Sequence, residues 1–276
     1  MIVLSFINMK GGVAKTTLAV NVADCLRRRH DSRVLIVDVD PQFNATQCLM
    51  TPEAYVNHVK TGGATIVHVF DRKARPRVGV VDGSAVEQPR TLESLEPVIV
   101  HERLHLLPGA LDLYRLEMAP GEGRENRLKK FLSTVSEKYD HVIIDTPPTP
   151  SVWMTSALIA SDYFVVPVRP DPISLTGIDL LNNIVAEKTE NFSLNLKCAG
   201  LILTVVESNT RVYETAIASL KKSKLWKSRL FEKSLIKRTK VAQQQLQQEF
   251  ILDSGDPELT LCITQITQEL LTRIGV

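Results

Sequence analysis

The sequence predicts an α/β fold with a mostly parallel, twisted sheet and helices on both of its faces. Short runs that are apolar at every position recur along the chain, as expected of strands buried on both faces. Segments with helical spacing of apolar residues separate these runs, which is the alternation of β–α–β units. Hydrophobic residues make up 44% of the 276 residues, which is enough for a large core and argues against disorder.

The elements can be assigned in order along the chain. We expect strands at residues 2–7, 34–37, 104–107, 141–144, 163–166 and 199–206, and helices at 16–29, 124–137, 172–186 and 259–276. The stretch 51–97 is less regular and contains Gly62-Gly63 and Arg75-Pro76-Arg77, so surface loops are expected there. Because we find no repeat and no clear linker, we expect residues 1–276 to form a single domain.

Composition argues against several other classes of protein. No apolar run is long enough to span a bilayer, and Met1 leads directly into a strand-like run without the basic segment and cleavage site of a signal peptide. We therefore expect a cytoplasmic protein. Its four cysteines are scattered without a CxxC pair, which favours small buried side chains over a metal or redox site.

The central motif is Lys10-Gly11-Gly12-Val13-Ala14-Lys15-Thr16-Thr17, between the first expected strand and the first helix. This setting is typical of a P-loop, in which backbone N–H groups and the helix N-terminus attract a phosphate group. Lys15 can reach the β- and γ-phosphate oxygens, and the hydroxyl of Thr16 can bind Mg²⁺. The alternative is a glycine-rich turn that happens to precede a helix.

Two acidic motifs follow later strands. Asp38-Val39-Asp40-Pro41-Gln42 comes after the second strand, and we expect its two carboxylates to have different roles. Asp145 follows an apolar strand, which is the Walker B pattern of a carboxylate held rigidly near a metal ion. Taken singly, such motifs are typical of a solvated loop or a helix N-cap. Their order and spacing after the P-loop favour a nucleotide site.

The P-loop motif resembles the deviant Walker A box of the ParA/MinD family of P-loop ATPases, and the chain is most similar to the short ParA (Soj-like) proteins. Two further segments extend the resemblance over most of the chain, Leu106–Gly109 and 166–177. The resemblance implies a P-loop NTPase fold with ATP and Mg²⁺ as cofactors. Most members have glycine where this chain has Ala14. If that position needs φ > 0, alanine costs of order 1 kcal/mol, which we expect the loop to tolerate.

The same resemblance assigns roles to individual residues. Residues 10–17 bind the nucleotide, and Lys10 crosses a dimer interface to the nucleotide of the partner subunit. The catalytic residues are Lys10, Lys15 and Asp40, with Asp40 orienting or activating the attacking water. The Mg²⁺ ion is served by Thr16, Asp38 and Asp145, with Asp38 supporting its coordination shell and Asp145 contacting it through water.

A basic stretch lies near the C-terminus, although the net charge of the chain is only +2. Residues 211–240 contain ten Lys or Arg and two Glu, whereas residues 241–276 contain one Arg and five acids. In ParA-like proteins, basic residues of this region bind DNA non-specifically by neutralising phosphates. The candidates are Arg211, Lys221, Lys222 and Lys224; the alternative is a solvated helix face. Trp226 and Phe231 are expected to be core anchors.

The resemblance therefore predicts an ATPase that slowly converts ATP to ADP and phosphate. ATP binding forms a nucleotide-sandwich homodimer that binds nucleoid DNA and positions or segregates a cargo, such as a plasmid, a chromosome or a carboxysome-like assembly. A ParB-like or adaptor protein stimulates hydrolysis.

Two alternatives stay open. A MinD-like membrane-associated ATPase would end in a basic amphipathic helix, but in residues 259–276 the only basic residue is Arg273. A metabolic P-loop ligase of the dethiobiotin or cobyrinic acid type would need a pocket for a carboxylate substrate.

Overall fold

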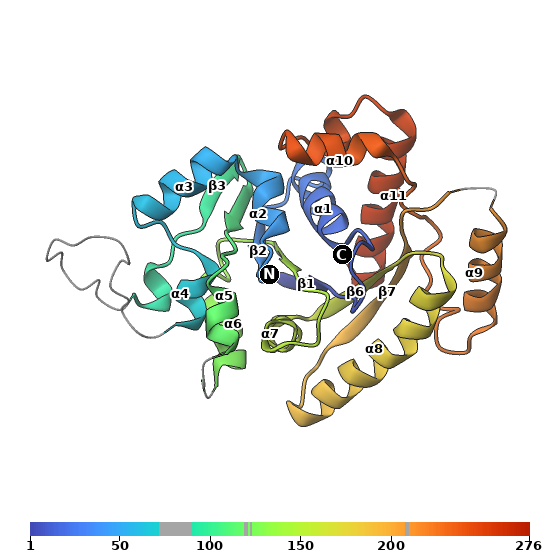
Figure 1. Ribbon diagram of the computed structural model, residues 1–276, viewed down its shortest axis with the longest axis horizontal. Helices are drawn as coiled ribbons and strands as arrows, with labels where there is room; N and C mark the ends of the chain where they lie inside the picture. The colour runs from blue at the N-terminus through green and yellow to red at the C-terminus, as the bar shows by residue number, and fades with distance from the viewer. Residues whose placement is uncertain (72–89, 119–120, 122, 208–209) are drawn as a thin grey trace, which may run out of the picture.

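The computed structural model describes residues 1–71, 90–118, 121, 123–207 and 210–276, with the backbone alone at 172–176. In these ranges a seven-stranded sheet runs in the order β3-β4-β2-β5-β1-β6-β7 (Figure 1). Strand β3 pairs antiparallel with β4, and the other neighbours are parallel, which confirms the predicted fold class. The strands are β1 (Ile2–Phe6), β2 (Val34–Asp38), β3 (Val98–His101), β4 (Leu104–Leu107), β5 (His141–Asp145), β6 (Tyr163–Val168) and β7 (Lys197–Leu203).

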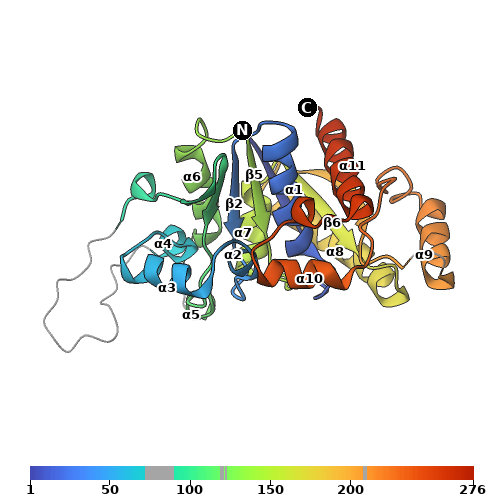
Figure 2. The ribbon, with the colours of Figure 1, turned by 90° about the horizontal axis from the view of Figure 1, so that it is seen from above.

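Helices cover both faces of this sheet (Figures 1 and 2). They are α1 (Lys15–Arg29), α2 (Asn44–Leu49), α3 (Pro52–Lys60), α4 (Ile66–Phe70), α5 (Leu113–Glu117), α6 (Arg127–Thr134), α7 (Val152–Ala160), α8 (Pro172–Asn191), α9 (Arg211–Lys222), α10 (Thr239–Leu246) and α11 (Pro257–Ile274). Short 3₁₀ turns are η1 (Leu92–Ser94), η2 (Arg124–Asn126) and η3 (Ile251–Asp253).

Alternate side chains of the central strands point to opposite layers of the core. Leu4 and Phe6 of β1 belong to a cluster with apolar residues of α1 and α11. Val3 belongs to a second cluster, on the other side, with Phe131 of α6 and Trp153 of α7. A third cluster joins β6 and β7 to α7, α8 and α9. Because the central strands are covered on both sides, β2 and β5 are buried at every position, as their continuous apolar sequence predicted.

The prediction of loops over residues 51–97 was wrong for much of that stretch. It contains α3, α4 and η1, while residues 72–89, with Arg75-Pro76-Arg77, lie outside the described residues. Helix α3 begins at a Thr51 N-cap followed by Pro52, but it buries none of its residues fully. The helix predicted at 124–137 begins as a 3₁₀ turn and ends at Thr134.

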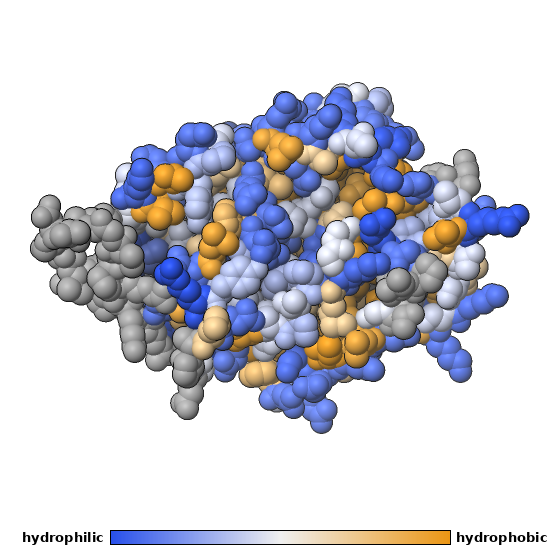
Figure 3. Space-filling model, viewed as in Figure 1, coloured by the Kyte–Doolittle hydropathy of each residue, from blue (hydrophilic) through white to orange (hydrophobic). Residues whose placement is uncertain are grey.

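The C-terminal predictions are confirmed. Helix α11 buries an apolar face that includes Leu259, Ile263 and Ile266, so it packs on the core. Trp226 and Phe231 are each 3% exposed and are core residues. Within the described ranges, no helix combines the length and the hydropathy needed to cross a membrane. On the face in Figure 3, apolar residues form small separate groups among polar ones.

Candidate functional site

Strand pairing brings the three sequence motifs together. Strand β5 lies between β1 and β2, and its last residue, Asp145, is in register with Phe6 on one side and Asp38 on the other. The P-loop leaves the end of β1, and Asp40 follows the end of β2. Because parallel strands present their carboxyl ends at one edge, residues more than a hundred positions apart in the sequence meet there.

The P-loop contains a backbone conformation that favours glycine. Ala14 has φ 59° and ψ 34°, in the left-handed region, at the start of α1. Gly12 also has a positive φ, of 69°. The carbonyl of Val13 accepts a hydrogen bond from the Thr204 hydroxyl at 2.9 Å, which ties the loop to β7. The loop is therefore held in a conformation that costs alanine of order 1 kcal/mol relative to glycine.

Lys15 is buried beneath the loop. Its side chain is 7% exposed, and Nζ donates to the carbonyl oxygens of Asn8 at 3.2 Å and Lys10 at 3.3 Å. Burial lowers the pKa of the ammonium group, while Asp145 and Asp40 oppose that shift. A cavity of about 480 Å³ adjoins it, and among the predicted nucleotide-binding residues 10–17 all but Lys10 line this cavity. Residues 11–17 thus present backbone N–H groups and the Lys15 ammonium group at this cavity.

Thr16 lines the cavity and is in contact with Asp145. The Thr16 hydroxyl donates to Oδ2 of Asp145 at 2.6 Å. Asp145 is fully buried, and its other oxygen, Oδ1, has no hydrogen-bond partner among the described residues. Burial raises the pKa of Asp145 to about 7. A hydroxyl beside a carboxylate with an unpartnered oxygen fits a divalent cation such as Mg²⁺.

The described residues contain no group of three His, Cys, Asp or Glu side chains that could hold a metal ion by themselves. The pair formed by Thr16 and Asp145 therefore fits a Mg²⁺ ion that is also bound by a ligand and water, rather than an ion held by protein side chains alone. Magnesium is usually bound through one or two carboxylates together with phosphate oxygens and water. Thr16 and Asp145 would be the protein ligands or water-mediated contacts of such an ion.

Asp38 and Asp40 lie in different surroundings, as expected from their positions. Asp38 is fully buried, and its Oδ2 accepts hydrogen bonds from the backbone and the hydroxyl of Thr46, both at 2.8 Å. Oδ1 of Asp38 accepts from the backbone N–H of Asp40 at 3.2 Å. Both oxygens of Asp38 thus organise the loop, and burial with nearby Asp145 raises its pKa well above the ordinary value. Its role toward Mg²⁺ stays a prediction.

Asp40 lies on the wall of the cavity. Its side chain is 5% exposed, and one oxygen, Oδ1, accepts a hydrogen bond from the backbone N–H of Gln42 at 2.9 Å. Burial raises the pKa of Asp40, while the Gln42 hydrogen bond and the charge of Lys15 lower it in part. A carboxylate that is partly desolvated and faces a phosphate site is suited to accept a proton from water.

Lys10 does not point into the cavity. Its Nζ contacts both carboxylate oxygens of Asp171 in the same chain, at 2.9 and 3.0 Å. Asn8 fixes the start of the loop, since its side chain accepts from the Lys10 N–H at 2.9 Å and donates to the Pro167 carbonyl at 2.6 Å. A Lys10 that reaches a partner subunit would first have to leave Asp171.

Sequence reasoning missed several residues of the site. Thr46 holds Asp38 and also accepts, through its hydroxyl, from the Gly109 N–H at 2.8 Å. Gln245 of α10 lines the cavity and bonds to Thr17. Asn8 could have been identified from the sequence, because it is a polar residue just after the buried strand β1 and two residues before Lys10. The pairing of Thr46 and Gln245 with the site is set by tertiary packing and had no local signal.

The four candidate DNA-binding residues are all exposed on or next to α9. Arg211 is at the first turn, and Lys221 and Lys222 are at the last, so they lie about 15 Å apart along the axis at ~1.5 Å per residue. Lys224 follows the helix. In the described part of the chain none of the four makes an ion pair, whereas Lys237 and Arg238 pair with acids. The structure therefore groups the three lysines and separates Arg211 from them.

Comparison of the sequence with known proteins gives two concordant results. A family model described as an AAA domain matches residues 1–198. The sporulation initiation inhibitor protein Soj of Bacillus subtilis is 32% identical over 222 residues, covering 80% of this chain and 79% of Soj. Residues 1–198, which the family model matches, contain the P-loop and both acidic motifs.

Comparison of the fold gives two kinds of neighbour. A plasmid partition protein of Borrelia burgdorferi bound to AMPPNP superposes with a TM-score of 0.75 at 23% identity, covering 99% of this chain and 98% of that protein. Cobyrinic acid a,c-diamide synthase of Mycobacterium smegmatis, with a bound ATP analogue and magnesium, gives a TM-score of 0.74 at 23% identity, covering 100% and 96%. The fold by itself thus does not separate these two classes; the sequence match does.

Proposed function

The chain belongs to the ParA/MinD family of P-loop ATPases, and we propose that it is a positioning ATPase controlled by its bound nucleotide. The observation that carries the proposal is the contact of Thr16 with Asp145, where Thr16 and the buried Lys15 line a cavity of about 480 Å³. ATP is the ligand in this proposal, with its phosphates on the loop of residues 11–17. The bound Mg²⁺ supplies neutralisation of charge on the phosphate oxygens.

The residues of this chain have separate tasks in the proposed hydrolysis. Backbone N–H groups of the P-loop and the N-terminus of α1 hold the phosphates. Lys15 exchanges its carbonyl contacts for phosphate oxygens and stabilises the charge that develops on them. Asp40, on the cavity wall, orients the attacking water and accepts its proton, for which a raised pKa is favourable. Asp38 keeps Asp40 in place through the backbone.

The nucleotide acts on a larger assembly in this proposal. Two ATP-bound subunits form a sandwich dimer, in which Lys10 leaves Asp171 and reaches the nucleotide of the partner subunit. The dimer binds nucleoid DNA through the lysines near α9. A ParB-like or adaptor protein then stimulates hydrolysis and releases it. This cycle positions or segregates a plasmid, a chromosome or a large protein assembly, and it places the protein in the cytoplasm on the nucleoid.

Asp40→Ala separates binding from turnover. Because Asp40 acts on the attacking water, we expect the variant to form the ATP-dependent dimer but to lose hydrolysis by 10²-fold or more, on the order of what general-base removal costs. Light scattering on a sizing column measures the dimer, and phosphate release measures turnover. Wild-type hydrolysis in Asp40→Ala would remove this residue from the mechanism. Loss of the ATP-dependent dimer would instead show that Asp40 is needed for binding.

A further inference from the structure

The turn that carries Asp40 ends at a strained residue. Phe43, between β2 and α2, has φ 41° and ψ 43°, a left-handed conformation that a bulky side chain rarely adopts. The Phe43 N–H donates to the Asp40 carbonyl at 2.8 Å, and the Gln42 N–H donates to Oδ1 of Asp40 at 2.9 Å. Because these bonds close the turn, the conformation of Phe43 affects where Asp40 lies.

Both ends of this turn are fixed to the rest of the protein. Asp38, at the end of β2, is fully buried and accepts a hydrogen bond from the Thr46 N–H of α2 at 2.8 Å. Helix α2 also buries Ala45 and Leu49. Strained backbone of this kind persists only where the surrounding structure enforces it. We therefore examined which contacts hold Phe43.

The ring of Phe43 stacks on the ring of Tyr55 in α3. The ring centroids are 5.4 Å apart, and the ring planes differ by 15°. The Tyr55 hydroxyl donates to the Gly109 carbonyl at 3.0 Å. Burial raises the pKa of Tyr55 to about 12, so the hydroxyl keeps its proton at neutral pH and stays a donor. An aromatic pair contributes a free energy similar in size to the cost of left-handed backbone, so this stack can offset much of the strain.

Gly109 packs directly on the same turn. A Cβ atom at this position would lie 2.6 Å from Cβ of Phe43 and 3.0 Å from Cγ of Asp38, so a larger residue would displace the turn. The Gly109 N–H donates to the Thr46 hydroxyl at 2.8 Å. Tyr55 therefore contacts both Phe43 and the backbone that packs against it.

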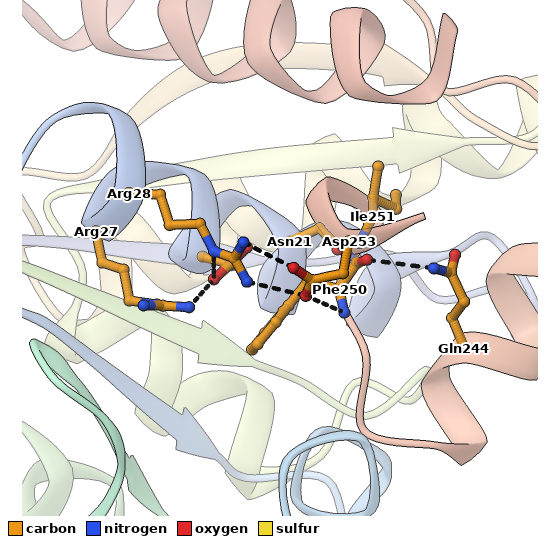
Figure 4. Close-up of polar contacts among 8 residues, drawn as sticks. Asn21, Arg27, Arg28, Gln244, Phe250, Ile251 and Asp253 are labelled. Atoms are coloured by element: carbon orange, nitrogen blue, oxygen red, sulfur yellow. Dashed lines mark hydrogen bonds and ion pairs between the residues drawn. The ribbon is translucent and has the colours of Figure 1, made fainter. Parts of the chain in front are cut away.

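The P-loop is held by other contacts. Helix α1, which begins in the P-loop, is joined to the segment after α10 by a bidentate ion pair of Arg28 with Asp253, at 2.7 and 2.9 Å (Figure 4). The described residues that line the 480 Å³ cavity include neither Phe43 nor Tyr55. Loss of the stack should therefore displace Asp40 without disturbing the residues that hold the phosphates.

We propose that Phe43 and Tyr55 are positioning residues for hydrolysis, whose stacked rings keep Phe43 in its left-handed conformation and thereby hold Asp40 at the cavity. The proposal rests on the proposed function, in which Asp40 acts on the attacking water. It gives α3 a role in turnover, although this helix buries none of its residues fully and does not line the cavity.

Tyr55→Ala removes the stack and leaves the strained backbone in place. In the full-length protein, it should lower kcat for Mg²⁺-ATP about tenfold, less than removal of Asp40 costs, because the carboxylate is displaced and not lost. KM should not change, since the phosphate contacts remain. Phosphate release at limiting and saturating ATP measures both. Tyr213→Ala is the matched control, because Tyr213 is a half-buried tyrosine of α9 in the third cluster and should have wild-type kcat and KM.

Two substitutions of Phe43 separate strain from packing. Phe43→Ala and Phe43→Gly both remove the ring, but only alanine keeps a Cβ atom that opposes the left-handed conformation. Phe43→Gly should therefore have a kcat about tenfold above that of Phe43→Ala. Adding Phe43→Gly to Tyr55→Ala should restore the lost turnover, because glycine needs no stack to keep the turn. A purely structural role would rank glycine at or below alanine, since glycine adds flexibility.

Wild-type kcat in Tyr55→Ala, or a Phe43→Gly variant no faster than Phe43→Ala, would overturn the proposal. Circular dichroism checks that each variant is folded, and if Tyr55→Ala is not, the alanine–glycine comparison decides alone. Asp40→Ala distinguishes the two levels of failure. If Asp40→Ala is inactive while Tyr55→Ala hydrolyses ATP normally, only the positioning role fails. If Asp40→Ala itself hydrolyses ATP normally, the role of Asp40 in the proposed function fails.

Discussion

Ala14 is the residue at which the P-loop departs most from what its side chain prefers. It takes a left-handed conformation at the start of α1, and no side chain caps the helix there. Glycine adopts this conformation without a steric cost, whereas alanine does not. The structure thus answers a question that the sequence only posed, since the sequence shows alanine at the position but not its dihedral angles.

Ala14→Gly should raise the free energy of unfolding by up to about 1 kcal/mol, because it removes strain that exceeds the added entropy of the unfolded chain. Chemical denaturation measures the change. Ala218→Gly makes the same substitution at an exposed position of α9, where it should lower stability by about 1 kcal/mol. A stability change of the same sign in both variants would contradict the strain at Ala14.

At the residue scale, the sequence predicted the parts of the site that are local. The P-loop is one continuous segment, and Asp40 and Asp145 each follow a recognisable strand. Contacts between distant residues could not be predicted, such as Thr46 with Gly109 or Lys10 with Asp171. These depend on the positions of whole elements, and no spacing in the sequence encodes them.

At the element scale, the predicted strands at the sheet centre were found because they are buried and apolar throughout. Helices α3 and α4 were missed for the opposite reason. Helix α3 buries no residue, and α4 has only five residues, so the apolar positions of each are too few to predict a helix from their spacing. The cap at Thr51-Pro52 was the only readable signal for α3.

The starts of β2 and β5 are joined by one ion pair. Arg33 donates to Asp140 through its backbone N–H at 2.8 Å and its guanidinium at 2.7 Å, and these hydrogen bonds lower the pKa of Asp140 to about 2. A carboxylate whose folded pKa is depressed stabilises the protein above its unfolded value of ~3.9. That stabilisation is lost as the pH falls from about 4 to about 2.

Asp140→Asn should therefore destabilise the protein at pH 7 and cost progressively less below pH 4. The pair is about half exposed, so solvent screening limits the cost to under ~1 kcal/mol. Denaturation curves at pH 7 and pH 3 measure it. Asp31→Asn serves as the control, because the Asp31 side chain is 81% exposed in its pair with Arg103 and should matter little. If Asp140→Asn lost more unfolding free energy at pH 3 than at pH 7, the lowered pKa assigned to Asp140 would be contradicted.

At the scale of the whole molecule, the nucleotide site and the candidate DNA surface lie apart. Helix α9 is at one edge of the molecule beside α8, whereas the P-loop is at the carboxyl edge of the central strands (Figure 1). Lys221, Lys222 and Lys224 lie at the C-terminal end of α9, where cations are favoured. In the proposed cycle, an ATP requirement for DNA binding would arise from assembly of two subunits, which would bring two such lysine groups to one DNA molecule.

DNA binding should need ATP and should weaken steeply with salt, because each neutralised phosphate releases counterions. The double variant Lys221→Glu/Lys222→Glu should lower affinity at least tenfold and reduce the salt slope by about 2. Lys129→Glu/Lys130→Glu makes the same charge change on exposed residues of α6 and should bind like the wild type. Equal binding without nucleotide, in gel shifts at two salt concentrations, would count against the nucleotide switch.

The most direct measurement is calorimetric titration of Mg²⁺-ATP into the wild type and into Lys15→Ala. Lys15 is buried at the P-loop, and its Nζ donates to the backbone carbonyls of Asn8 and Lys10, which phosphate oxygens would replace. We predict that the wild type binds ATP and that Lys15→Ala, although folded, does not. Micromolar ATP affinity retained by Lys15→Ala would contradict the assignment of this loop as the nucleotide site.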